Sequence, residues 1–170
     1  MEKRNKKSSL GTAYVHGFRW ALRHKYDFIF EMDADFSHNP NDLEKLYNAC
    51  HLGDADLAIG SRYVTGVNVV NWPLSRVLMS YFASVYVRMI TGMKIHDATA
   101  GFVCYKSEVL VGINLDKIKF VGYAFQIEMK YRAFVNKFNI ILTINLNCKT
   151  AFYGKILLKM KQLLIQFFPF

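Results

Sequence analysis

The sequence predicts an α/β fold with a mostly parallel sheet and helices on both faces. Segments with helical apolar periodicity alternate with short apolar runs, and the chain has 170 residues, of which 52% are hydrophobic. A chain of this length can bury a substantial core. Strands that alternate with helices favour parallel pairing, because each helix returns the chain to the same end of the sheet.

The first half of the chain supplies two helices and two strands. The helices are expected at residues 12–24 and 37–50, and the strands at 28–30 and 55–63. Thr12 is a suitable N-cap for the first helix. In the second helix, Asn39 can cap the start and Pro40 suits the first turn, while Gly53 ends the helix.

The second half repeats the alternation after a loop that contains Gly66 and Pro73. The longest helical pattern covers residues 74–91 and carries one apolar stripe, formed by Leu74, Val77, Leu78, Tyr81, Phe82 and Val85. Strands are then expected at 101–105 and 139–144, and helices at 106–112 and within 120–138. Ligands of such sheets bind at the carboxyl ends of strands, so side chains just after the strands are the informative ones.

The positive charge of the chain is concentrated at its two ends. The net charge is +9, of which residues 1–10 carry +3, residues 149–170 carry +4 and residues 11–148 carry only +2. This distribution argues against nucleic-acid binding, which needs a basic face on the folded body. The three cysteines form no C-x-x-C pair, so no zinc or redox motif is indicated, and no apolar run reaches the length of about 18 residues that spans a membrane.

Two carboxylates follow the first strand. Asp33 and Asp35 lie two residues apart and point to the same side if the extended conformation continues. A divalent cation removes their mutual repulsion, and oxygen ligands without Cys or His suit Mg²⁺ or Mn²⁺. The alternative is a pair of solvated loop acids, since a D-x-D pair alone is a weak signal.

Cationic side chains follow the second strand. Arg62 comes directly after it, and an arginine there can hold a phosphate with its planar fork. Arg76 and Ser80 are four residues apart on the long helix, so both project from one face and can add a cation and a hydroxyl. A solvated helix face is the alternative for Arg76.

Three further groups are candidates for a supporting role. Asp97 and Thr99 belong to a polar turn that leads into the third strand, where they can also simply cap local amides. Gln126 and Glu128 are flanked by apolar residues, so at least one is expected to be buried and paired. Gly11 precedes the first helix and can let backbone amides approach a phosphate. His38 and His96 lie next to these groups in the sequence and can reach a ligand.

Five segments in this order resemble one known family. EMDADFSHNP, GSRYVTG, RVLMS, HDATAGF and GYAFQIEM together resemble polyprenol (dolichyl) phosphate mannosyltransferases of glycosyltransferase family 2. The resemblance covers residues 10 to 140 and implies a GT-A fold. It implies transfer of mannose from GDP-mannose to a polyprenol or dolichyl phosphate with inversion, on the cytoplasmic face of the membrane as a peripheral protein.

The resemblance also assigns residues. Asp33 and Asp35 would bind Mg²⁺ or Mn²⁺ and the donor diphosphate, with Gly11 nearby on the donor side. Arg62, Arg76 and Ser80 would bind the acceptor phosphate, and Asp35 and Arg62 would be the catalytic pair. A residue that is often Gln in this family, two positions after the second Asp, is Ser37 here. An acceptor phosphate is already anionic, so no general base is assigned.

Both ends of the chain depart from the family pattern. Residues 1–10 are expected to be a basic leader left from a missing nucleotide-binding half, residues 11–141 a partial GT-A domain, and residues 142–170 a divergent tail. Loss of the early strands would expose apolar edges at 28–32 and 57–60, lower solubility or require a partner chain, and weaken GDP-mannose binding.

Three other functions remain open at this point. Another family 2 enzyme could transfer a different sugar, such as glucose. A phosphatase could use the D-x-D pair, although no convincing later Lys or acidic pair is found. The chain could also be an inactive fragment or a membrane-surface module, for which residues 155–168 combine apolar residues with three lysines.

Overall fold

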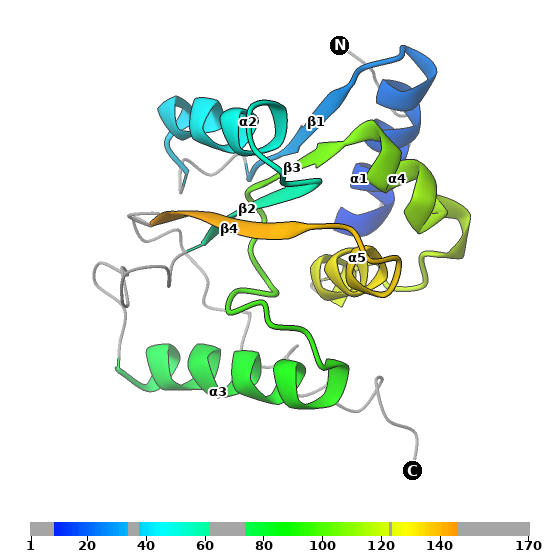
Figure 1. Cartoon of the computed structure of the whole chain (residues 1–170). Coiled ribbons are helices and arrows are strands. Elements are labelled where there is room, and N and C mark those ends of the chain that lie inside the picture. Colours follow the sequence, from blue (N-terminus) through cyan, green and yellow to red (C-terminus); the bar gives the residue numbers. More distant parts are fainter. Residues whose placement is uncertain (1–8, 34–37, 62–73, 123, 146–170) are drawn as a thin grey trace.

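A four-stranded sheet in the order β1-β3-β2-β4 lies at the centre of the structure, a computed structural model that describes residues 9–33, 38–61, 74–122 and 124–145 (Figure 1). The strands are β1 (Phe28–Glu31), β2 (Leu57–Ser61), β3 (Val103–Lys106) and β4 (Ile140–Asn145). The helices are α1 (Leu10–Arg23), α2 (Leu43–His51), α3 (Leu74–Thr91), α4 (Ser107–Ile113) and α5 (Ala124–Val135), with 3₁₀ turns η1 (Pro40–Asp42) and η2 (Leu115–Lys117).

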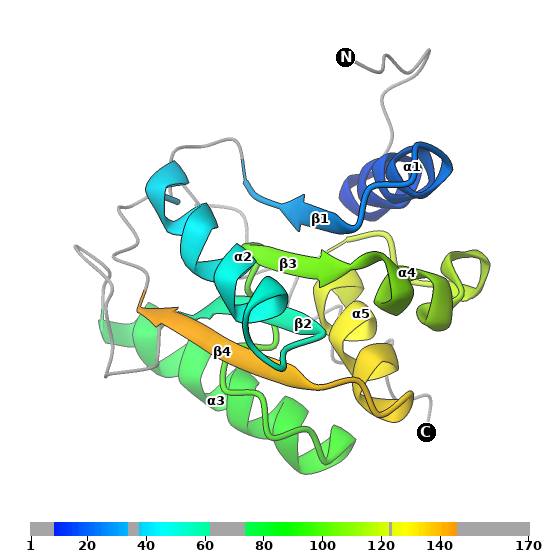
Figure 2. The ribbon, with the colours of Figure 1, turned by 45° about the horizontal axis from the view of Figure 1, so that its top comes forward.

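Alternating side chains give the sheet two buried faces. Along β2, Leu57 and Ile59 enter the larger core, whereas Ala58 between them enters the smaller one. Helices α1, α4 and α5 supply the larger core, and α2 covers the opposite face through Leu46 and Cys50 (Figure 2). This is the period-two pattern of a sheet buried on both sides, and it confirms the predicted α/β class.

One strand runs against the other three. β3 pairs antiparallel with both β1 and β2, and β2 pairs parallel with β4. Strands β1, β2 and β4 therefore share one direction, as expected for a mostly parallel sheet. The expectation of an open edge at residues 57–60 is wrong, because β2 lies between β3 and β4, whereas β1 is an edge strand of the described sheet.

The predicted helices are confirmed. Of the two predicted N-cap residues, one is confirmed and the other is wrong. Asn39 caps η1 as expected, since its Oδ1 accepts a hydrogen bond from the Asn41 amide at 3.1 Å. Thr12 is not an N-cap, because α1 begins at Leu10 and Ser9 takes the cap position. The Thr12 hydroxyl instead donates to the Ser9 carbonyl at 2.7 Å, which places it inside the first turn.

Helix α3 lies apart from the sheet (Figure 1). Leu78, Tyr81 and Phe82 are all exposed. Among the described residues, no helix is both long enough and apolar enough to cross a bilayer.

Candidate functional site

The reversed direction of β3 brings two sequence motifs to the same sheet edge. Asp33 follows the end of β1, and the 97–101 turn precedes the start of β3, which is antiparallel to β1. The last residue of β1, Glu31, pairs in register with the first residue of β3, Val103. The carboxyl end of β1 and the polar turn therefore lie at the same edge of the sheet.

Asp33 packs directly against Gly101. A Cβ atom added at Gly101 would lie 3.1 Å from Asp33 Oδ2, so a larger residue here would push the carboxylate away by a few tenths of an ångström. His38 Nε2 lies 3.6 Å from the same oxygen, and Tyr14 donates a long hydrogen bond of 3.5 Å to Oδ1. The His38 ring stacks on Phe102 and is 7% exposed, whereas the Asp33 side chain is 32% exposed. Asp33 is thus held from one side and open to solvent on the other.

A fully buried polar network lies behind Asp33. Glu31 on β1 accepts hydrogen bonds from the Tyr105 hydroxyl at 3.1 Å and from Gln126 Nε2. Gln126 is itself buried, and its Oε1 accepts a hydrogen bond from Lys130 Nζ at 3.1 Å. The network therefore links β1, β3 and α5 and confirms that Gln126 is a buried, paired residue.

Burial is the main influence on the pKa of the Glu31 carboxyl group. Loss of hydration raises the pKa of Glu31 from 4.5 to about 7. The charge of Lys130 and the hydrogen bonds from Gln126 and Tyr105 act in the opposite direction, while the charge of Asp33 adds to the increase. A carboxyl group two residues before the D-x-D pair is therefore partly protonated near neutral pH.

Lys130 connects this network to the turn against which Asp33 packs. Its ammonium group is completely buried and donates to the Ala100 carbonyl at 2.7 Å and to the Gln126 carbonyl at 3.3 Å. Ala100 is the neighbour of Gly101, so Lys130 fixes the backbone on which the Asp33 carboxylate rests. A buried cation with several acceptors also offsets the negative charge gathered at this edge.

Asp97 and Thr99 stabilise the turn from within. Asp97 is fully buried, and the Thr99 hydroxyl donates to its Oδ1 at 3.4 Å, while the Ala100 amide donates to the Asp97 carbonyl at 3.3 Å. These bonds show a turn closed by its own residues, while a supporting role of Asp97 and Thr99 at the site stays a prediction.

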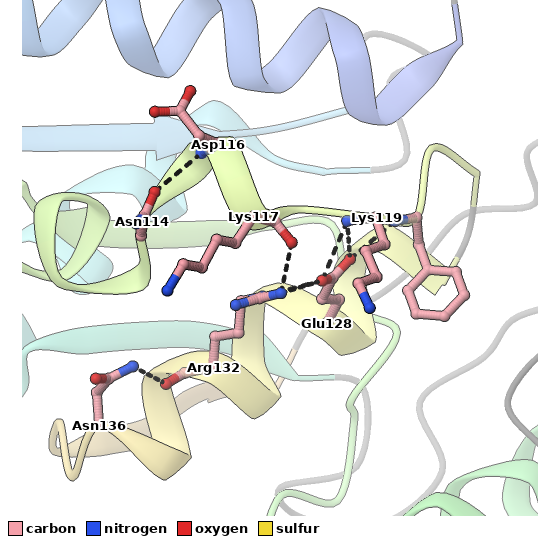
Figure 3. A network of polar contacts seen from close by, with 8 residues as sticks. Asn114, Asp116, Lys117, Lys119, Glu128, Arg132 and Asn136 are labelled. Atoms are coloured by element: carbon pink, nitrogen blue, oxygen red, sulfur yellow. Dashed lines mark hydrogen bonds and ion pairs between the residues drawn. The ribbon is translucent and has the colours of Figure 1, made fainter.

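Glu128 belongs to a separate structural contact at the start of α5 (Figure 3). Its carboxylate accepts hydrogen bonds from the amides of Lys119 and Phe120, each at 2.9 Å, and pairs with Arg132 at 2.8 Å. Arg132 also donates to the Lys117 carbonyl, at 2.5 Å. Glu128 is thus buried and paired as expected, but its partners fix the segment before α5 and are not among the residues around Asp33.

Gly11 has a packing role in this structure. Its amide donates to the Val121 carbonyl at 2.9 Å. A Cβ at this position would lie 3.0 Å from Phe120, Val121 and Phe125 atoms, so α1 can approach that loop only with glycine here. The place of Gly11 on the donor side stays a prediction.

The remaining predicted site residues cannot be placed with Asp33. Asp35 and Arg62 lie outside the described residues. Arg76 and Ser80 both belong to α3, one turn apart, but their side chains are also outside the described part. Within the described ranges, no group of three or more His, Cys, Asp or Glu residues could hold a metal ion.

Sequence reasoning missed Glu31, Tyr105 and Lys130. Glu31 ends an otherwise apolar strand, and Lys130 follows Gln126 by one helical turn within an apolar segment. A charged residue inside an apolar run is the signal that could have found both. Tyr105 gives no such signal, because an aromatic residue in a strand is ordinary.

Comparison with known proteins identifies the family of this chain. Residues 2–112 match the family described as Glycosyl transferase family 2. The chain is 48% identical over 138 residues to a polyprenol monophosphomannose synthase of Mycolicibacterium smegmatis, covering 81% of this chain and 52% of the relative. It is 46% identical over 129 residues to an undecaprenyl-phosphate mannosyltransferase of Micrococcus luteus, covering 76% and 52%. It is 38% identical over 120 residues to a dolichol-phosphate mannosyltransferase of Pyrococcus furiosus, covering 69% and 33%.

A solved structure supports the fold. Glucosyl-3-phosphoglycerate synthase of Mycobacterium tuberculosis superimposes with a TM-score of 0.60 at 12% sequence identity, over 96% of this chain and 55% of that protein. This likeness confirms the GT-A type of α/β fold. The chain spans about half the length of the first two curated relatives. With a family match over most of its length, and with the Asp33 motif at the sheet edge, this chain belongs to glycosyl transferase family 2.

Proposed function

We propose that this chain takes part in metal-assisted transfer of mannose from GDP-mannose to a polyprenol or dolichyl phosphate, with inversion at the sugar. The observation that carries the proposal is the agreement of three relatives, at 38% to 48% identity, whose names all describe mannosyl transfer or synthesis on a polyprenyl-type phosphate. Asp33, the described half of the D-x-D pair, is held at the sheet edge with its carboxylate open to solvent.

On the donor side, Asp33 and Asp35 would hold Mg²⁺ or Mn²⁺. The Asp33 carboxylate is a hard oxygen donor with solvent access, which fits such an ion, and Asp35 would supply a second oxygen. A metal held there would supply positive charge for the departing diphosphate. Gly101 and His38 keep the Asp33 carboxylate in place before any ligand arrives.

On the acceptor side, Arg62, Arg76 and Ser80 would bind and aim the lipid phosphate. The acceptor oxygen is anionic near neutral pH, so it needs orientation and charge stabilisation more than a base. Asp35 and Arg62 would be the residues nearest to the reacting atoms. Asp97, Thr99 and Gln126 support the turn and the network behind Asp33.

The acceptor is a lipid, so we also propose a peripheral position on the cytoplasmic face of a membrane. A partner chain that contributes the nucleotide-binding part is also included in the proposal, and the matched residues cover 52% of each of the first two relatives. Residues 11–141 are proposed as the glycosyltransferase part, although β4 continues the sheet to Asn145.

The test is a transfer assay with radiolabelled GDP-mannose and undecaprenyl phosphate in detergent, with Mn²⁺ or with EDTA. We expect metal-dependent label in the lipid fraction that is lost in Asp33→Asn and Arg62→Ala, while the matched surface variant Asp116→Asn keeps it. Label from UDP-glucose or GDP-glucose instead of GDP-mannose would favour another family 2 enzyme. Release of inorganic phosphate from polyprenyl phosphate without sugar transfer would favour the D-x-D phosphatase. No transfer from any donor, with Mn²⁺ binding absent as well, would indicate an inactive fragment.

A further inference from the structure

Two free cysteine thiols meet in the smaller core of the sheet. Cys50 lies in the last turn of α2 and Cys104 lies in β3, and the two residues are 1% and 0% exposed. The Cys50 thiol donates a hydrogen bond to the carbonyl oxygen of Cys104, with 3.8 Å between the sulfur and the oxygen. No step proposed for sugar transfer uses either thiol.

The two side chains come from facing elements. Cys104 pairs in register with Ala58 of β2, and both belong to the core that α2 covers. Cys50 enters the same core from the helix, together with Leu46. A disulfide can form only between side chains that face each other at short range. A bond between these two sulfur atoms would therefore join a helix to the strand on which it already packs.

The two thiols differ in reactivity. A hydrogen bond with the Cys104 thiol lowers the pKa of Cys50 against the effect of burial, and the Ala58 amide adds to the decrease. The same hydrogen bond, together with burial, raises the pKa of Cys104. The thiolate is the form that reacts with oxidants. Cys50 is therefore the member of the pair that reacts first, and Cys104 is the thiol available to complete the reaction.

We propose that Cys50 and Cys104 form a reversible disulfide when the protein meets a peroxide. The Cys50 thiolate attacks one oxygen of hydrogen peroxide and becomes a sulfenic acid, while the other oxygen leaves as hydroxide and is protonated to water. The Cys104 thiol then attacks the Cys50 sulfur, the sulfur–oxygen bond breaks, and a second water leaves. Two thiols and one hydrogen peroxide thus give one disulfide and two waters, and a small thiol such as glutathione reverses the bond by exchange.

Access to the pair depends on α2, which lies across this face of the sheet (Figure 2). Among the described helices, only α2 contributes to the smaller core, and it has nine residues. A short helix with few inward side chains opens locally at a lower free energy than the whole domain. Such opening exposes Cys50 to a small oxidant while the larger core on the other face stays closed.

The disulfide would hold α2 closed against β3. It closes a loop of about 55 residues, which stabilises the folded state relative to the unfolded chain. The bond also lies close to the candidate site, because Phe102, two residues before Cys104, carries the stacked ring of His38. Oxidation would therefore stiffen the smaller core beside Asp33.

The experiment is peptide mapping of the full chain after treatment with one equivalent of hydrogen peroxide. Free thiols are blocked with iodoacetamide in urea, and trypsin then releases Cys50 within residues 46–62, Cys104 within residues 95–106 and Cys148 within residues 138–149. We expect 46–62 and 95–106 to be disulfide-linked in the oxidised protein and separate after reduction, with Cys148 alkylated in both. The melting temperature should rise by about 5–10 °C on oxidation and return on reduction.

A matched pair of glycine variants tests the route of access. Glu44 and Glu108 are both exposed glutamates in the first turn of a helix, α2 and α4 respectively. Glu44→Gly should accelerate disulfide formation about fivefold, because glycine disfavours the helix that covers the thiols. Glu108→Gly should leave the rate unchanged. Equal rates in the two variants would refute local opening of α2 as the route.

Three results would overturn the proposal itself. One is a folded, peroxide-treated protein in which Cys50 and Cys104 are both still alkylated, or in which the link involves Cys148 or a second chain. Another is Cys50 oxidised to a sulfinic acid with no linked peptide, since Cys104 would then not complete the reaction. The third is a lower melting temperature of the linked form, which would show that the native packing does not accept the bond. Because no sugar nucleotide, lipid or metal is present, these results are independent of the proposed function.

Discussion

Replacing Lys130 with Met should destabilise the protein far more than an ordinary lysine substitution. The ammonium group is completely buried and donates to three acceptors, the Ala100 carbonyl and two oxygens of Gln126. Methionine keeps the length and apolar volume of the side chain, so the change removes the charge and its hydrogen bonds with little effect on packing.

The expected magnitude follows from what remains after the change. Glu31 stays buried without the cation that lowers its pKa, and three acceptors lose their donor. A buried acceptor that loses its donor costs about 1–3 kcal/mol, so the three acceptors of Lys130 together give a loss of several kcal/mol. Natural domains have a stability of about 5–15 kcal/mol, so Lys130→Met should lose a large part of the total.

Urea unfolding followed by far-UV circular dichroism measures the effect. The control is Lys117→Met, because Lys117 is exposed and its side chain makes no described contact (Figure 3). Surface substitutions of this kind change stability by less than about 0.5 kcal/mol. Comparing two Lys→Met changes cancels the intrinsic difference between the two side chains.

A double variant separates the charge argument from simple packing. With Glu31→Gln present, Lys130→Met no longer leaves a buried carboxylate, so its cost should shrink by at least about 1 kcal/mol. A loss below about 1 kcal/mol in Lys130→Met, or strict additivity of the two changes, would refute the idea that Lys130 balances the acids at this edge.

Three further predictions concern the residues around Asp33, and a fourth concerns the separate contact of Glu128. The free energy of unfolding should fall by about 3 kcal/mol between pH 4.5 and pH 7. The reason is that the folded state holds the Glu31 proton up to a pKa of about 7, whereas the unfolded chain releases it near 4.5. Urea titrations at several pH values should show this decrease in the parent and a smaller one in Glu31→Gln. Gly101→Ala should weaken Mn²⁺ binding by about tenfold with little change in melting temperature, because the new Cβ would lie 3.1 Å from Asp33 Oδ2. Electron paramagnetic resonance measures the binding, and unchanged binding would mean that Asp33 is not a ligand. Asp33→Asn should abolish the binding of Mn²⁺ to the protein without unfolding the chain, since the Asp33 carboxylate is partly exposed. Glu128→Ala should cost about 2–3 kcal/mol in urea and leave Mn²⁺ binding intact, because its bonds go to the amides before α5 and to Arg132.

Local patterns identified the elements of this fold with few errors. The four strands were predicted from apolar runs and the five helices from 3.6-residue periodicity, since both signals depend only on neighbouring residues. Thr12 was misplaced as a cap because helix boundaries shift by one or two residues with little change in energy. The edge predicted at residues 57–60 was wrong for a different reason: strand order depends on pairing between distant segments, and β4 covers β2.

The residues of the candidate site also divide into those that a local pattern identifies and those that only the tertiary structure reveals. Asp33 was recognised from the sequence because a carboxylate after a buried strand is a local pattern, and the family resemblance followed from five such segments in order. At least one of Gln126 and Glu128 was expected to be buried, but no local pattern tells which of them belongs near Asp33. That distinction depends on which side of α5 faces β1.

The residues of the chain by themselves determined the alternation of strands and helices, the acid pair after β1 and the family, since each is a property of neighbouring residues or of their order. Only the tertiary structure decided that β3 runs against its neighbours and so brings Gly101 to Asp33. It also decided that Lys130 donates a hydrogen bond to the Ala100 carbonyl and that an apolar side of α3 is exposed. These facts depend on contacts between residues 30 or more positions apart, or on which surface remains uncovered, and no local pattern encodes either.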